Sequence, residues 1–223
     1  MNAQRSAGKN SESERSLTRL YLVTCAQTVL HKEGVFRGSA HHRLSPEGMR
    51  HARLLSNYLQ AEKMDAFYSS PSEGAFQTAS VLAARHRRGV VRIRDLDEMD
   101  YGKWTGKMAE ELKESAPEEL ITWQFEPHKH RMPGGETVGE VQDRVVQALN
   151  KILAVEKGEG VCVVSHPIPV KAAMCYFTDD HLSLIWLTPP QESTALNVID
   201  FENDEPQVME TSSLQHLGKK VIT

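Results

Sequence analysis

Short apolar runs alternate with amphipathic stretches along most of the chain. The runs are rich in β-branched or aromatic residues and end at polar or turn-forming residues, which is typical of strands in a largely parallel sheet. On this pattern the sequence predicts strands at Thr18–Val23, Asp65–Ser70, Val90–Arg94, Gly160–His166, Thr194–Phe201 and Gln207–Ser212. The last two follow each other closely, so we expect them to pair.

Helical periodicity fills most of the intervals between these runs. Ser45 and Pro46 form a helix start, with the serine as N-cap and the proline at the first helical position, and Pro167 is a second such start. Further helices are predicted at Ala75–Arg85, Met108–Glu114, Glu118–Phe125 and Thr137–Glu156. Because strands alternate with helices, we expect an α/β fold: a three-layer sandwich with a mostly parallel central sheet.

The length of the chain bounds its domain organisation. Its 223 residues can bury a full core without a metal or a disulfide, so a single domain is expected at 17–215. Residues 1–16 are polar and mixed in charge, which predicts a disordered leader rather than a signal peptide, and residues 216–223 are expected to form a tail. No apolar run approaches the ~20 residues that span a bilayer.

Charge and cysteine content narrow the classes of partner and compartment. The net charge of −4 is mild for this length, so neither nucleic acid nor a membrane is expected as partner. Cys25, Cys162 and Cys175 have no metal-ligand spacing among themselves, and three cysteines do not suit a secreted disulfide framework. We therefore expect a cytoplasmic protein that binds a small molecule or a protein partner, with homo-oligomerisation left open.

Candidate chemistry gathers where the predicted strands end. Cys25 follows the first strand, the segment Ser69–Gly74 ends the second, Glu98 comes after the third and His166 ends the fourth. In open α/β sheets the carboxyl ends of the strands meet at one edge, and binding groups collect there. The sequence therefore predicts that a thiol, a carboxylate and an imidazole share one cleft.

The chain also resembles a known family in a series of segments that occur in the family's order. The segments are "LYLVTCAQTVLHKEGVFRG", "LSPEGMRHA", "FYSSPSEGAFQTA", "LDEMDYGKWTGK", "PGGETVGEVQDRV" and "VCVVSHP". Together they resemble the histidine phosphatase superfamily, also called phosphoglycerate mutase-like, from about Arg19 to Phe201. The resemblance implies the family's fold and a cleft at the strand ends.

At the reactive positions the chain departs from the family's pattern. The family's first strand ends in Arg-His-Gly, with the histidine as phosphorylated nucleophile, but here Thr24 and Cys25 take the places of the arginine and the histidine. His31 matches a family asparagine, and Gly74 matches a second phosphate-binding arginine. The resemblance leaves Glu98 as the family's general acid and His166 as its second phosphate-contacting histidine, with Pro167 in place of a glycine.

The missing arginines limit what the site is expected to do. An arginine–phosphate pair contributes roughly 1.5–3 kcal/mol, so losing two weakens phosphate binding by ~10² to 10⁴-fold. The loss is larger in the transition state, where guanidinium groups stabilise the charge on the transferring group. We expect a degenerate site that has lost ordinary phosphohistidine chemistry.

Three interpretations of Cys25 remain open from the sequence. It is a filler in the space of the lost imidazole, or a thiolate nucleophile paired with His166 and assisted by Glu98, or a ligand of a divalent metal such as zinc together with His31, His166 and Glu98. No other cofactor is expected. Three functions remain open as well: a ligand- or partner-binding pseudoenzyme, a repurposed enzyme that uses Cys25, His166 and Glu98, with or without a metal, on another substrate, and a weak phosphomonoesterase or mutase.

Overall fold

The computed structural model describes residues 17–29, 34–38 and 42–218. The predicted leader, His31 and residues 219–223 of the predicted tail lie outside the described residues. The strands are β1 (Thr18–Thr24), β2 (Ala66–Ser69), β3 (Val91–Arg92), β4 (Gly160–Ser165), β5 (Leu196–Glu202) and β6 (Glu205–Ser213). The α-helices are α1 (Pro46–Tyr58), α2 (Glu73–His86), α3 (Ala109–Ser115), α4 (Pro117–Phe125), α5 (Val138–Val155) and α6 (Pro167–Phe177).

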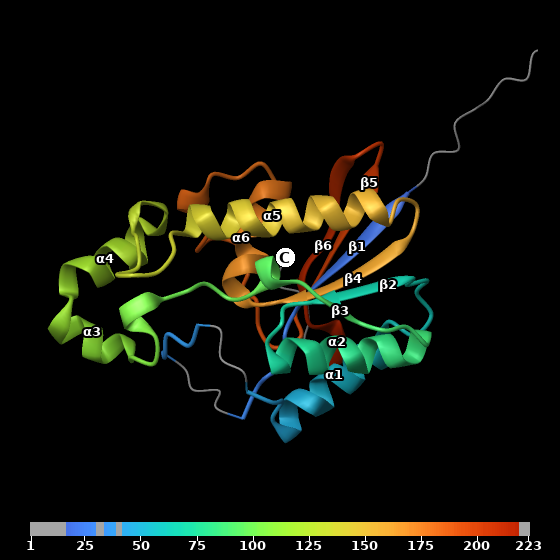
Figure 1. The fold of residues 1–223 in the computed structure, drawn as a ribbon, viewed down its shortest axis with the longest axis horizontal. Coiled ribbons are helices and arrows are strands. Elements are labelled where there is room, and N and C mark those ends of the chain that lie inside the picture. The colour runs from blue at the N-terminus through green and yellow to red at the C-terminus, as the bar shows by residue number, and fades with distance from the viewer. Residues whose placement is uncertain (1–16, 30–33, 39–41, 219–223) are drawn as a thin grey trace, which may run out of the picture.

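The strands form one sheet in the order β3-β2-β4-β1-β5-β6. The first four in this order run parallel, while β5 is antiparallel to β1 and pairs with β6, as the sequence predicts. Helices α5 and α6 cover one face of the sheet, and α1 and α2 cover the other (Figure 1). The α/β sandwich with a mostly parallel sheet is therefore confirmed.

Local signals in the sequence explain where the helices begin. The side chain of Ser45 accepts a hydrogen bond from the Gly48 amide at 2.9 Å, and Pro46 opens α1. Thr137 caps α5 in the same way and forms a capping box with Glu140. These helix starts agree with the prediction to within one residue.

The core has a layer on each side of the sheet. Alternate side chains of β1 point to opposite faces, so Leu20 and Leu22 pack towards α5 and α6 while Tyr21 and Val23 pack towards α1 and α2. Cys162 and Cys175 are buried in these layers. Packing on both faces therefore fixes β1 and β4 along their whole length, as far as the residues that follow them.

A lobe built from α3 and α4 extends beyond the carboxyl ends of the parallel strands (Figure 1). Aromatic rings join it to the rest of the molecule: Phe36 packs edge-on against Trp104 at 5.1 Å and against Tyr101 at 5.3 Å between ring centroids. The ring of His130 lies 5.0 Å from that of Trp104. Tyr101 lines the cleft and its ring lies 6.2 Å from that of Trp123 in α4, so the lobe packs against the cleft wall.

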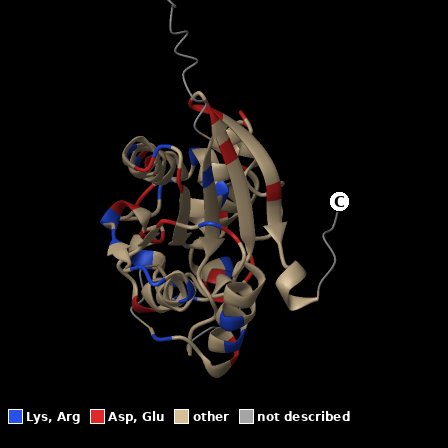
Figure 2. Ribbon diagram, turned by 90° about the vertical axis from the view of Figure 1, so that its right-hand side faces the viewer, with Lys and Arg blue, Asp and Glu red and all other residues tan. Residues whose placement is uncertain are grey.

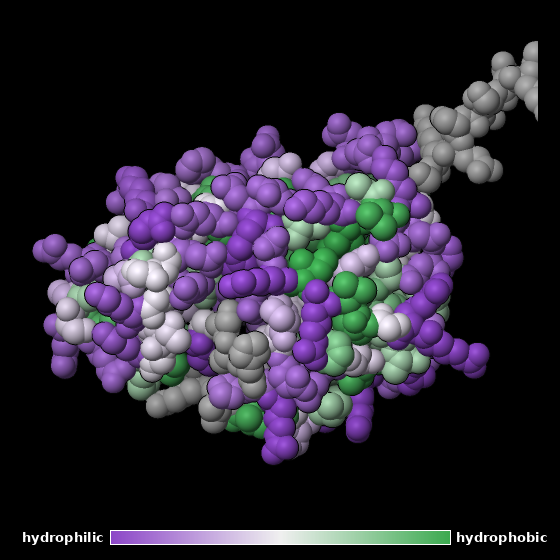
Figure 3. All heavy atoms as spheres, viewed as in Figure 1, coloured by the Kyte–Doolittle hydropathy of each residue, from purple (hydrophilic) through white to green (hydrophobic). Residues whose placement is uncertain are grey.

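The surface carries charge of both signs. Lysine and arginine residues are interspersed with aspartate and glutamate along the ribbon (Figure 2). Apolar surface gathers in a strip beside α5 (Figure 3), and Val91 on the edge strand β3 and Val155 at the end of α5 are exposed. Among the described residues, no helix is long and apolar enough to cross a membrane.

The turn Gln215–Leu217 packs its His216 ring near Tyr58, so the first residues of the predicted tail belong to the folded domain.

Candidate active site

A cavity of about 480 Å³ opens at the carboxyl ends of β1, β2 and β4. The predicted site residues Cys25, Glu98 and His166 line it, and so do Thr24 and Gly74. His31, the remaining predicted site residue, lies outside the described residues. The rest of the wall is formed by Ala26, Gln27, Thr28, Val35, Arg37, Gly38, His51, Ser72, Tyr101, Pro167, Ile168, Gln191, Glu192 and Ser193.

Strand register explains why Cys25 and His166 meet. β1 and β4 are parallel neighbours with Thr24 opposite Ser165, so the next residue of each strand leaves the sheet at the same level. The Cys25 amide donates to the Ser165 carbonyl at 2.8 Å, which extends the pairing by one step. The sulfur of Cys25 then lies 3.5 Å from Nδ1 of His166, within hydrogen-bond reach for sulfur.

The other ring nitrogen of His166 faces a set of oxygens. Nε2 lies 2.7 Å from Oγ of Ser70, 3.3 Å from Oγ of Ser72 and 3.3 Å from Oδ1 of Asp97. Ser70 in turn donates its hydroxyl proton to Asp97 at 3.1 Å. The oxygens of Ser70 and Asp97 can therefore both accept a hydrogen bond from the N–H at Nε2. This arrangement keeps a proton on Nε2 and aims Nδ1 at the thiol.

The charges around His166 favour its protonated form. Burial of the ring lowers the pKa of His166, but the charge of Cys25, the hydrogen bond to Asp97 and the charge of Glu98 outweigh it and raise the pKa to about 10. The residue is only 7% exposed, so water screens these interactions weakly. An imidazolium therefore faces the sulfur of Cys25.

The loop that carries Asp97 and Glu98 is fixed by its backbone. Arg144 of α5 donates to the carbonyls of Asp97 and Glu98 at 2.8 and 3.1 Å, and Ser165 donates to the carbonyl of Leu96 at 2.6 Å. One carboxyl oxygen of Glu98 accepts from the Met99 amide at 2.8 Å. Burial raises the pKa of Glu98, against the lowering influence of His166.

The first family arginine position is filled by a side chain from another part of this chain. Thr24 is 1% exposed and its hydroxyl donates to Oε1 of Gln191 at 3.2 Å. Gln191 is also bound to Asn197 through two hydrogen bonds of 3.1 and 3.0 Å. Asn197 donates to the Leu22 carbonyl at 3.1 Å, which anchors this amide pair to β1. A buried polar network therefore stands beside the position from which a guanidinium would reach into the cleft.

The second family arginine position is closed as well. A Cβ atom built on Gly74 would lie 2.7 Å from Cγ2 of Thr28 and 3.2 Å from the backbone oxygen of His42. Thr28 is held there by a bridge to Leu44, and the Val29 amide donates to the Arg43 carbonyl at 3.1 Å. Even a methyl group at position 74 would require this wall to move.

The start of α6 offers few donors to an anion. Helix N-termini bind phosphate through backbone N–H groups of the first turn. Here the first turn contains Pro167 and Pro169, which have no N–H, and only Ile168 between them retains one. The helix that follows His166 is therefore a poor phosphate site.

Several residues of the site were not predicted from the sequence. Asp97, rather than Glu98, makes the contact with His166, whereas the sequence predicted an assisting role for Glu98. His51 lines the cavity and lies 3.3 Å from Oγ of Ser193 and 2.9 Å from the carboxylate of Glu47. Arg37 also lines the cavity and supplies positive charge there. The only advance signal for Asp97 was its place directly before Glu98, after a predicted strand.

Metal binding was one of the three interpretations of Cys25. Within 17–29, 34–38 and 42–218, no three histidine, cysteine, aspartate or glutamate side chains are grouped so that they could hold a metal ion. The predicted ligand set included His31, which lies outside these ranges. Among the described residues, Cys25 contacts the imidazole of His166, whose other ring nitrogen faces the carboxylate of Asp97.

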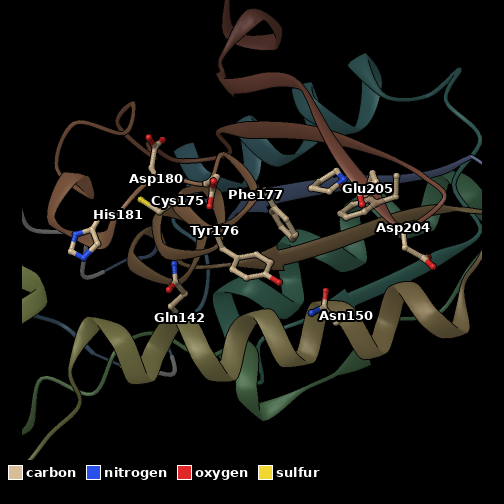
Figure 4. A pocket seen from close by; sticks show the side chains of 12 residues that line it. Gln142, Asn150, Cys175, Tyr176, Phe177, Asp180, His181, Asp204 and Glu205 are labelled. Atoms are coloured by element: carbon tan, nitrogen blue, oxygen red, sulfur yellow. The ribbon is translucent and has the colours of Figure 1, made fainter.

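A second hollow, of about 650 Å³, lies elsewhere, between α5, the end of α6 and the turn between β5 and β6. In Figure 4, Gln142 and Asn150 point from α5 towards Tyr176, with Asp180 and His181 at one end and Asp204 and Glu205 at the other. Two of its acidic groups already have partners, since Asp204 pairs with Lys157 at 2.9 Å and Asp180 accepts from Thr178 at 2.6 Å. None of the predicted site residues lines this hollow.

The geometry and the order of the segments agree with comparisons to known proteins. The family model of the histidine phosphatase superfamily (branch 1) matches residues 20–213. The chain therefore belongs to this superfamily, which confirms the predicted family and its phosphoglycerate mutase-like fold.

Three similar proteins illustrate the relationship, and two of them are phosphoserine phosphatases by name. Phosphoserine phosphatase 1 of Hydrogenobacter thermophilus is 30% identical over 91% of this chain and 96% of its own length. The structure of Bacillus stearothermophilus YhfR matches with a TM-score of 0.85 and 26% identity, covering 90% of this chain and 99% of that one. A phosphoserine phosphatase mutant from Entamoeba histolytica, solved with phosphoserine, matches with a TM-score of 0.79 and 21% identity, covering 90% and 99%.

Proposed function

We propose that this chain has lost the phosphohistidine-based phosphatase or mutase activity of its superfamily and that its cleft binds a small-molecule ligand. The observation that carries the proposal is the state of the two arginine positions. Gln191 stands beside Thr24, and Thr28 with the His42 carbonyl closes the space at Gly74. Other groups of this chain therefore occupy the space beside both positions, so the difference from the family pattern extends beyond these two side chains.

The rest of the site supports the same conclusion. Cys25 stands at the nucleophile position, and the first turn of α6 lacks two N–H donors. Removal of two arginine–phosphate contacts weakens binding by ~10² to 10⁴-fold before any effect on the transition state. A phosphate ester is therefore a poor substrate for this cleft.

The dimensions of the cleft favour a small molecule over a protein partner. Its volume of about 480 Å³ lies within the ~300–1,000 Å³ typical of small-molecule pockets. Its wall combines apolar groups such as Val35 and Ile168 with a few polar ones, including Arg37 and His51. Such a mixture fixes the orientation of a ligand that buries most of its surface.

Two measurements on the full chain test this proposal. A panel of phosphate esters, phosphoserine included, is expected to show no hydrolysis above buffer, with His166→Ala as comparison. A library of small carboxylates, esters and thioesters is then screened for compounds that raise the melting temperature. A compound that occupies the cleft is expected to protect Cys25 from alkylation by iodoacetamide, whereas Cys162 and Cys175 are buried and serve as internal controls.

Two results would contradict the proposal. One is phosphatase turnover that disappears in His166→Ala. The other is a ligand that raises the melting temperature but leaves alkylation of Cys25 unchanged, since that ligand binds elsewhere.

A further inference from the structure

Three side chains form a continuous hydrogen-bonded series from the floor of the cleft into the protein. The sulfur of Cys25 lies 3.5 Å from Nδ1 of His166, and Nε2 of the same ring lies 3.3 Å from the carboxylate of Asp97. A nucleophile, a base within reach and a third group that orients the base are the parts of a nucleophilic triad on any fold. The outer member, Cys25, lines the cavity, while His166 is 7% exposed.

We propose that Cys25 is a nucleophile towards activated acyl compounds, thioesters and activated esters in particular, with His166 as its proton donor and acceptor and Asp97 as a positioning residue. The proposal rests on the ligand-binding cleft proposed above. It goes further because the ligand becomes covalently attached to the protein.

The chemistry of the wall favours a carbonyl group over a phosphoryl group. Phosphoryl transfer requires cations around three charged oxygens, and both arginine positions are closed by Gln191 and Thr28. An acyl carbonyl develops charge on only one oxygen. Glu98 lines the cavity, and its carboxyl group, when protonated, can donate a hydrogen bond to that oxygen; burial raises the pKa of Glu98 and so shifts it towards this form.

The ring of His166 has the orientation that this chemistry needs. Ser70, Ser72 and Asp97 surround Nε2 and keep its proton in place, so Nδ1 is the nitrogen that exchanges a proton at the cleft. The same charges raise the pKa of His166 to about 10 after burial has lowered it, which places an imidazolium next to the sulfur at neutral pH. The thiolate is the nucleophilic form of cysteine.

The reaction is balanced with water as the second substrate. The Cys25 thiolate attacks the carbonyl carbon and forms a C–S bond, and the bond to the leaving group breaks as Nδ1 of His166 gives that group its proton. A water molecule then attacks the thioester while Nδ1 takes a proton from it. The C–S bond breaks, the thiolate and the imidazolium are restored, and the products are a carboxylic acid and the protonated leaving group.

The test uses S-acetyl-N-acetylcysteamine, a small thioester, with the full-length protein. Rapid mixing and acid quenching are followed by intact-protein mass spectrometry and peptide mapping. The expected result is the mass of one acetyl group on Cys25 and none on Cys162 or Cys175. Cys25→Ser is expected to lose the adduct, and His166→Asn to slow its formation at pH 7 by about 10²- to 10⁴-fold, the usual contribution of general acid–base catalysis.

Asp97→Asn tests the positioning role separately. It is expected to keep Cys25 reactive but to move the loss of acetylation at alkaline pH to lower pH, because the hydrogen bond to Asp97 raises the pKa of His166, the proton donor. His181→Asn is the matched control, since His181 is exposed, lines the other hollow and hydrogen-bonds to Ser183. Circular dichroism and urea unfolding confirm that each variant is folded. Mapping of the adduct in the wild-type protein needs no variant at all.

Three results would overturn the inference: no acetyl adduct in the wild-type protein, an adduct on lysine instead of Cys25, or acetylation of Cys25 at the same rate in folded His166→Asn. If the thioester raises the melting temperature and protects Cys25 from iodoacetamide without acetylating it, the covalent step is wrong and the ligand-binding cleft stands. If neither binding nor acetylation occurs and phosphate esters are hydrolysed, both proposals fail.

Discussion

The closure of the cleft at Gly74 predicts that a single methyl group is destabilising there. In Gly74→Ala the new Cβ would lie 2.7 Å from Cγ2 of Thr28 and 3.2 Å from the His42 carbonyl oxygen, against the ~3.5–4.0 Å of an ordinary contact. Overpacking of this kind costs about 1–3 kcal/mol, and the better helix propensity of alanine offsets about 0.5–1 kcal/mol. We expect a net loss of about 1–2 kcal/mol in the free energy of unfolding.

Gly139 of α5 supplies a matched control. Both glycines are the second residue of their helix, but a Cβ on Gly139 meets only Oγ1 of Thr137, at 3.7 Å. Gly139→Ala is therefore expected to be neutral or slightly stabilising. The assay is urea unfolding followed by tryptophan fluorescence, supported by a melting temperature that falls by ~2–4 °C per kcal/mol for a protein of this size.

A second variant shows whether Thr28 causes the effect. Thr28→Ser removes Cγ2, so Thr28→Ser with Gly74→Ala is expected to recover part of the loss, with a coupling energy of about 1 kcal/mol. The recovery is partial because the His42 carbonyl remains in place. If Gly74→Ala unfolds at the same urea concentration as Gly139→Ala, the space beside Gly74 is open and an arginine was lost there without any rebuilding.

Three further predictions concern buried polar groups. Burial and the nearby His51 lower the pKa of His216 to about 4, so the unfolded chain binds more protons than the folded one between about pH 6.5 and 4. The free energy of unfolding is expected to fall by about 1–3 kcal/mol as the pH drops through this window. In His216→Gln this fall is expected to be smaller, as measured by urea unfolding at each pH. Burial raises the pKa of Glu98, so ionisation of its carboxyl group opposes folding. Glu98→Gln is therefore expected to have a higher free energy of unfolding than wild type at pH 8 but not at pH 4. The same difference in unfolding free energy at both pH values would contradict this. Gln191→Ala leaves Asn197 without two hydrogen bonds and is expected to cost about 1–3 kcal/mol, whereas an unchanged unfolding midpoint would show that this network does not hold the wall.

The elements that the sequence predicted well are those with strong local signals. The run Gly160–His166 is apolar up to Val164 and became β4 up to Ser165. Ser45 with Pro46 marked the start of α1 to the residue. The meeting of Cys25 with His166 was predictable too, because it needs only two parallel strands and the rule that binding groups gather at their ends.

The groups that close the cleft were not predictable in this way. Gln191 reaches Thr24 from 167 positions away, and nothing in its neighbourhood marks it as a cleft residue. The contact between Asp97 and His166 depends on Arg144 of α5, whose guanidinium group donates to the Asp97 carbonyl and so fixes the loop that carries Asp97. From the sequence, Glu98 was the natural partner for His166, because the family resemblance names it and says nothing of its neighbour. Such contacts follow from tertiary packing, which a local pattern does not encode.

The loss of phosphoryl transfer is tested most directly by one rate. Hydrolysis of phosphoserine by the purified protein is compared with that by phosphoserine phosphatase 1 of Hydrogenobacter thermophilus, a relative that is 30% identical, under the same conditions. The account predicts release of phosphate at the rate of buffer alone, unchanged in His166→Ala. Release above buffer that is abolished by His166→Ala would show that the rebuilt cleft still transfers phosphate.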